Sequence, residues 1–105
     1  MPRTAPPDSA TPFIARHLIV YGRVQGVFYR QSMIDVATPL SLRGWVRNRS
    51  DGTVEALVQG PETAVQTLIA WANQGPDRAQ VERVVARDRP LIDNLGPAFE
   101  RRATL

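Results

Sequence analysis

The stretch YGRVQGVFYRQSM, residues 21–33, decides how the first part of this chain folds. An apolar run ends at Gly22, a short loop with a second glycine at position 26 follows, and aromatic residues then lead directly into Arg30. Glycine tolerates the backbone conformations that a tight loop requires. From Val27 onward the apolar residues recur at helical spacing. The order therefore predicts a strand, a loop and a helix, with a guanidinium on the first helical turn.

The junction between this strand and this helix is a candidate anion site. The first backbone N–H groups of a helix have no helical acceptor, and the helix dipole adds partial positive charge beside them. Such a terminus can bind an anion. Arg30 would oppose the dipole, at a cost of roughly 0.3–1 kcal/mol, unless an anion shares the site. On this motif alone, a phosphate site and an ordinary turn with a solvent-facing arginine both stay open.

The rest of the chain alternates between strand and helix patterns. Strands are expected at residues 17–22, 42–48, 53–59 and 79–87, helices at 27–38 and 60–76, and a short final strand at 98–104. Asp51 and Gly52 predict a hairpin turn, and Pro39 is expected to end the first helix. The order β-α-β-β-α-β predicts an α+β fold of the ferredoxin-like split βαβ type, in which two helices cover one face of an antiparallel sheet.

Length and composition limit the possible functions. The 105 residues are enough for one small domain, and their 43% hydrophobic content is that of a globular protein. Residues 1–15, rich in Pro, Ala, Ser and Thr, predict a disordered tail, which leaves residues 16–105 as the domain. Because cysteine is absent and His17 is the sole histidine, we expect no metal site. We also expect a cytoplasmic protein without a membrane partner, since no apolar run is long enough to span a bilayer and the N-terminus lacks a secretion signal.

Three motifs in order, GRVQGVFYR, GWVRN and DGTVEALVQG, resemble the acylphosphatase family over about residues 16–87. The resemblance implies a ferredoxin-like fold and the hydrolysis of carboxyl-phosphate anhydrides without metal or cofactor. It also implies that Arg30 and Asn48 are the catalytic residues. The phosphate-binding residues that it implies are Val24, Gln25, Gly26, Val27, Phe28, Tyr29 and Arg30.

The substrate implied by the resemblance is a small-molecule acyl phosphate. We also expect the protein to be a monomer. The leaving group of the substrate is a carboxylate, a weak base that needs no general acid. Catalysis then depends on positioning and on charge stabilisation, as in other phosphoryl transfers. The loop amides and Arg30 would bind the phosphate oxygens, while the side-chain carbonyl of Asn48 would orient a water for in-line attack on phosphorus.

Two positions depart from the family pattern. Ser41 stands where the family usually has glycine, directly after Pro39 and Leu40, and a serine there would cost of order 1 kcal/mol if the position requires a positive φ. Tyr29 stands where many members have phenylalanine.

Two alternative functions are an RNA-binding and a non-catalytic phosphate-binding ferredoxin-like module. RNA binding by such a sheet requires exposed aromatic residues for base stacking. Tyr21 and Trp45 are isolated in this sequence, so we expect no nucleic-acid partner. The presence of both Arg30 and Asn48 favours the enzyme.

Overall fold

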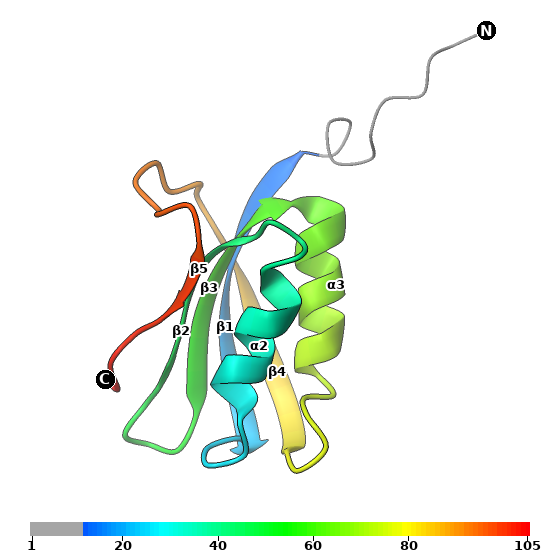
Figure 1. Cartoon of the computed structure of the whole chain (residues 1–105), viewed down its shortest axis with the longest axis vertical. Coiled ribbons are helices and arrows are strands. Elements are labelled where there is room, and N and C mark those ends of the chain that lie inside the picture. Colours follow the sequence, from blue (N-terminus) through cyan, green and yellow to red (C-terminus); the bar gives the residue numbers. More distant parts are fainter. Residues whose placement is uncertain (1–11) are drawn as a thin grey trace, which may run out of the picture.

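The structure, a computed structural model, describes residues 12–105 as a five-stranded sheet with two helices on one face (Figure 1). In chain order the elements are β1 (Phe13–Arg23), α2 (Tyr29–Ala37), β2 (Arg43–Asn48), β3 (Val54–Pro61), α3 (Glu62–Ala72), β4 (Gln80–Arg89) and β5 (Phe99–Arg101). The strands lie in the order β4-β1-β3-β2-β5. The predicted ferredoxin-like fold is therefore confirmed, with β5 as an additional edge strand.

The sheet is mixed, so the prediction of an antiparallel sheet is wrong at one edge. β1 pairs antiparallel with β3 and β4, and β2 pairs antiparallel with β3, but β5 runs parallel to β2. The reason is the long connection at residues 90–98, which carries the chain from β4 at one edge to β2 at the other. Gln59 of β3 fixes this connection, because its side chain donates to the Ile92 carbonyl (3.1 Å) and accepts from the Ile92 amide (2.8 Å).

β1 begins earlier than the sequence pattern indicates. Phe13 pairs with Pro61 at the end of β3, and the Glu62 amide donates to the Pro12 carbonyl over 2.9 Å. Residues 13–15 therefore belong to the sheet, although we expected order to begin near Arg16. The remainder of the predicted tail, residues 1–11, lies outside the described residues.

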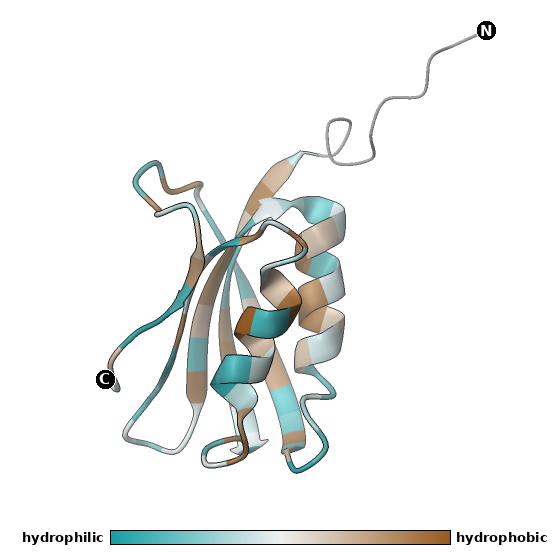
Figure 2. Cartoon of the chain, viewed as in Figure 1, coloured by the Kyte–Doolittle hydropathy of each residue, from teal (hydrophilic) through white to brown (hydrophobic). Residues whose placement is uncertain are grey.

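The core lies between the sheet and the two helices. Figure 2 shows hydrophobic and hydrophilic residues interleaved along both helices, as expected for helices that are buried on one side only. The helix residues that are fully buried are Tyr29, Met33 and Ala37 of α2 and Val65, Leu68 and Ala72 of α3. They pack in one cluster with buried strand residues, among them Leu18, Val20, Val46, Val54, Ala56 and Val58. This packing fixes the start of α2 relative to the strands.

The turn between α2 and β2 contains a strained residue, Ser41. Its φ of 57° lies in the left-handed region, which is the condition under which serine is costly. Three backbone hydrogen bonds close the turn: the amides of Leu40 and Leu42 donate to the Ala37 carbonyl (3.1 and 3.2 Å), and the Ser41 amide donates to the Thr38 carbonyl (3.0 Å). Serine in place of glycine at position 41 therefore lowers the stability of the folded protein, and the strain lies in the turn that leads into β2.

We expect Ser41→Gly to raise the free energy of unfolding by about 0.5–1 kcal/mol. Glycine relieves the left-handed strain of roughly 1–2 kcal/mol but adds entropy to the unfolded chain, which offsets part of the gain. Urea unfolding followed by circular dichroism measures the difference. Ser32→Gly within α2 is the matched control and should lower the stability by about 0.5 kcal/mol. A loss of stability in both variants would contradict the assigned strain.

Candidate active site

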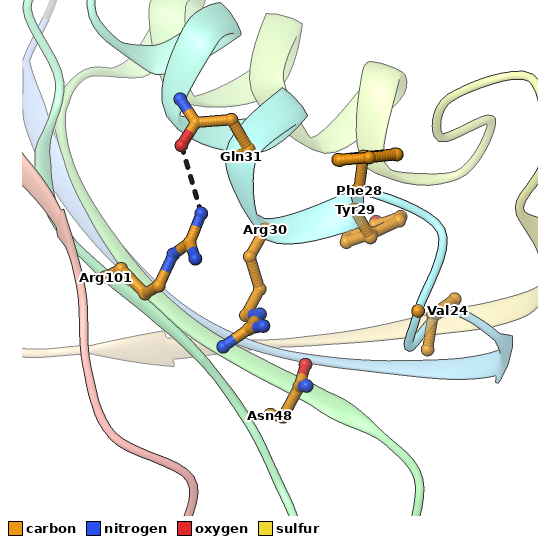
Figure 3. A pocket seen from close by; sticks show the side chains of 8 residues that line it. Val24, Phe28, Tyr29, Arg30, Gln31, Asn48 and Arg101 are labelled. Carbon is orange, nitrogen blue, oxygen red and sulfur yellow. Dashed lines mark hydrogen bonds between the residues drawn. The ribbon is translucent and has the colours of Figure 1, made fainter.

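One cavity of about 430 Å³ collects residues from three parts of the chain (Figure 3). Its lining residues are Val24, Gly26, Phe28, Tyr29, Arg30, Gln31, Asn48 and Arg101. They come from the loop after β1, from the first turn of α2, from the last residue of β2 and from β5. The structure thus brings together every candidate site residue of the sequence analysis except Gln25 and Val27.

The loop between β1 and α2 leaves backbone donors free. It turns through two residues with left-handed backbone, Gly26 (φ 73°) and Phe28 (φ 63°), and Phe28 is the N-cap of α2. The amides of residues 25–31 donate to no backbone carbonyl within residues 12–105, and the first turn of α2 carries no acidic residue. The positive end of the helix dipole is therefore uncompensated by the described part of the chain.

Gln25 and Val27 hold this loop in place, and their side chains do not line the cavity. The Gln25 side-chain amide donates to the carbonyls of Arg49 (2.8 Å) and Thr53 (2.9 Å), on either side of the β2–β3 turn. Val27 is buried in the core. The loop is thereby attached to the sheet close to the end of β2. A role in phosphate binding stays a prediction for the backbone amides of these two residues.

Arg30 and Asn48 point toward one another across the cavity (Figure 3). Arg30 is the second residue of α2, and no carboxylate of residues 12–105 forms an ion pair with it. Asn48 ends β2, and its side-chain Oδ1 is buried without a hydrogen-bond partner in the described chain. A buried acceptor without a donor costs about 1–3 kcal/mol, so the unpartnered Asn48 oxygen calls for an explanation. The cavity thus combines a cation without a counter-ion and an acceptor without a donor.

Tyr29 forms one wall of the cavity and joins the two helices. Its hydroxyl donates to the Ala72 carbonyl over 2.7 Å, and its ring lies against Trp71 with the ring centroids 5.2 Å apart. Burial raises the pKa of the Tyr29 hydroxyl above its usual range, so the group stays protonated at neutral pH. The hydroxyl that distinguishes this position from phenylalanine therefore has a structural partner in α3.

The sequence analysis missed two lining residues, Gln31 and Arg101. The Arg101 Nη2 donates to the Gln31 Oε1 over 3.0 Å, and the Gln31 Nε2 donates to Asp35 Oδ1 over 2.9 Å. The alternation of β5 could have indicated that Arg101 shares a sheet face with Phe99. That alternation does not predict that β5 pairs with β2, so it could not have shown that Arg101 lines the same cavity as Asn48.

Within residues 12–105, no group of three or more His, Cys, Asp or Glu side chains lies close enough together to hold a metal ion. In the same part of the chain, no helix has the length and apolar character needed to cross a membrane.

Comparison with known proteins agrees with this geometry. The profile of the family described as Acylphosphatase matches residues 16–100. An acylphosphatase of Acidovorax sp. (strain JS42) is 54% identical over 92 residues, which are 88% of this chain and 93% of the relative. An acylphosphatase of Thiobacillus denitrificans is 59% identical over 87 residues, which are 83% of this chain and 94% of the relative. The solved acylphosphatase of Coxiella burnetii superposes with a TM-score of 0.82 at 34% identity, covering 90% of this chain and 97% of its own.

The fold and the site define an α+β protein with a cavity at a helix N-terminus that is lined by two arginines and an asparagine. The family match spans most of the chain, and relatives well above 30% identity are covered almost completely. This chain belongs to the acylphosphatase family.

The buried Tyr29 hydroxyl should make stability fall at alkaline pH. Its pKa is raised in the folded state, so above about pH 10 the unfolded chain loses this proton while the folded chain keeps it. We expect the free energy of unfolding to drop by up to about 1.4 kcal/mol per pH unit above pH 10. The sequence contains no lysine, which keeps this pH range free of amine titration.

Urea unfolding at several values between pH 8 and pH 11.5 tests this prediction in wild type and in Tyr29→Phe. The variant should be about 1 kcal/mol less stable at pH 8, because it lacks the hydrogen bond to Ala72, and its stability should no longer respond to Tyr29 ionisation. Tyr21→Phe is the control and should keep the wild-type slope. An unchanged slope in Tyr29→Phe would show that another group causes the alkaline loss.

Proposed function

We propose that the protein hydrolyses acyl phosphates to a carboxylate and inorganic phosphate, with Arg30 and Asn48 as its catalytic residues. Membership of the acylphosphatase family supports the reaction. The observation that carries the assignment of the two residues is their pairing in one cavity. There a guanidinium faces a buried amide oxygen, and residues 12–105 provide neither a counter-ion for the one nor a donor for the other. The guanidinium of Arg30 can bind the phosphoryl group, and the amide oxygen of Asn48 can orient the attacking water.

The phosphoryl group binds at the start of α2. Loop amides of residues 24–29 and the planar fork of Arg30 donate to its oxygens, and the helix dipole adds to the attraction. This role is supported by the backbone hydrogen bonds of the described chain, because none of them uses these loop amides as donors. Because these groups are held by the fold before substrate binds, they stabilise the charge of the transition state without reorganisation.

The attacking water binds to Asn48. Its Oδ1 accepts a hydrogen bond from the water and so directs a water lone pair at phosphorus, in line with the bond to the acyl oxygen. As the new P–O bond forms, the bond between phosphorus and the acyl oxygen breaks, and its electron pair leaves with the carboxylate. Both protons of the water stay with the phosphate product, which is released as dihydrogen phosphate and then equilibrates with solvent. An amide is too weak a base to remove a proton from water, so Asn48 contributes alignment. No carboxylate or histidine lines the cavity within residues 12–105, consistent with a leaving group that needs no acid.

The two alternative functions fit the site less well. A simple phosphate-binding module would have no use for the Asn48 oxygen, because that oxygen repels a phosphate oxygen and needs a donor such as water. RNA binding would require free aromatic faces on the sheet. Trp45 is only 9% exposed, with Arg47 and Arg102 over its ring, and Arg83 lies over the ring of Tyr21 at 3.9 Å. The expected monomeric state and cytoplasmic location stay predictions.

Steady-state hydrolysis of benzoyl phosphate tests the two residues separately. Arg30→Ala should lower kcat/KM by about 10³-fold or more, since it removes both phosphate binding and charge stabilisation in the transition state. Asn48→Ala should lower kcat by about 10²-fold while KM changes less than about threefold, because alignment of the water matters only in the chemical step.

Arg78→Ala and Asn94→Ala are the matched controls, since both residues are exposed on loops outside the cavity. They should keep wild-type activity, and all four variants should retain the wild-type circular dichroism spectrum. If Arg30→Ala released phosphate as fast as wild type, the assignment of the site would be wrong.

A further inference from the structure

Arg101 brings a second guanidinium to the cavity that contains Arg30. Phe99, two residues earlier on β5, is buried in the core. Since side chains alternate along a strand, Arg101 lies on the same face of the sheet as Phe99, toward α2. Arg102 lies on the other face, with its guanidinium 5.0 Å from the centre of the Trp45 ring. Of these two consecutive arginines, only Arg101 lines the cavity.

A neutral group orients Arg101 and leaves its charge uncompensated. Its Nη2 donates to the Oε1 of Gln31 over 3.0 Å, and Gln31 is held in turn by Asp35 in the next turn of α2. No carboxylate of residues 12–105 forms an ion pair with Arg101. A guanidinium has five N–H donors in a planar fork, so one bond to Gln31 leaves most of them available for an anion.

The cavity contains Arg101 in addition to the groups that we propose for the phosphoryl group. The loop amides, the dipole of α2 and Arg30 already provide an anion site, and no acidic residue of the described chain lines the cavity. In Figure 3, Arg30 lies between Arg101 on one side and Val24 and Phe28 on the other. A volume of about 430 Å³ lies within the range of small-molecule pockets, so an acyl group has room beside the phosphoryl group.

We propose that Arg101 forms an anion subsite for the acyl group, so that the enzyme prefers acyl phosphates whose acyl group carries a second negative charge. This inference rests on the proposed function. The second anion is a carboxylate or a phosphate-like group, because the guanidinium fork binds either through two parallel hydrogen bonds. Arg101 then determines which acyl phosphate is used, while Arg30 and Asn48 act on the phosphoryl group common to all of them.

A matched pair of substrates isolates the second charge. Butyryl phosphate and succinyl phosphate have four-carbon acyl chains and differ in a terminal methyl or carboxylate group. The wild-type kcat/KM should be at least about tenfold higher for succinyl phosphate. In Arg101→Gln this ratio should fall about tenfold, while kcat/KM for butyryl phosphate stays within about threefold of wild type. 3-Phosphonopropionyl phosphate, which ends in a phosphonate, then distinguishes a subsite for carboxylates from one for phosphate-like groups.

Arg102→Gln is the control, because it removes the same charge one residue away on the opposite face of the sheet. It should leave the ratio unchanged. Arg101→Lys, which keeps the charge but loses the fork, should restore part of the preference. A ratio that is unaffected in Arg101→Gln, or an equal loss with both substrates, would overturn the subsite. Failure of the wild type to hydrolyse either substrate would instead contradict the proposed function.

Discussion

The uncompensated positive charge at the start of α2 is the constraint around which this protein is organised. Free backbone donors, the helix dipole and the Arg30 guanidinium all have the same sign at one point, and a helix terminus is otherwise more stable with an acidic residue there. The surrounding contacts keep these groups together. Gln25 attaches the loop to the β2–β3 turn, Val27 is buried in the core, and Tyr29 connects the first turn of α2 to α3.

The opposite wall of the cavity is held by the sheet. Asn48 is the last residue of β2 and pairs with Val54 of β3 on one side. On the other side its backbone carbonyl accepts a hydrogen bond from the Leu105 amide over 3.1 Å, and the Ser50 amide donates to the Leu105 carbonyl over 3.2 Å. With its backbone fixed from both sides, Asn48 can keep a buried oxygen without a partner, because few alternative positions are open to the side chain.

The sequence predicted best what depends on neighbours along the chain. The strand, loop and helix around Gly26 follow from local periodicity, and the left-handed conformation of Ser41 follows from a departure at a single position. It predicted poorly what depends on long-range pairing. The early start of β1 at Phe13 requires β3 as its partner, and the parallel β5 requires a connection across the whole sheet. Arg101 was missed for the same reason.

The edge position of β5 has a consequence for how this family can diversify. β5 covers three residues and pairs with β2 alone, whereas the loop, α2 and β2 depend on the buried core. A substitution at Arg101 changes an exposed side chain and leaves Phe99 in its buried place. The substrate preference that we propose for Arg101 can therefore change through a single substitution at the edge of the sheet, without moving Arg30 or Asn48, the proposed catalytic residues.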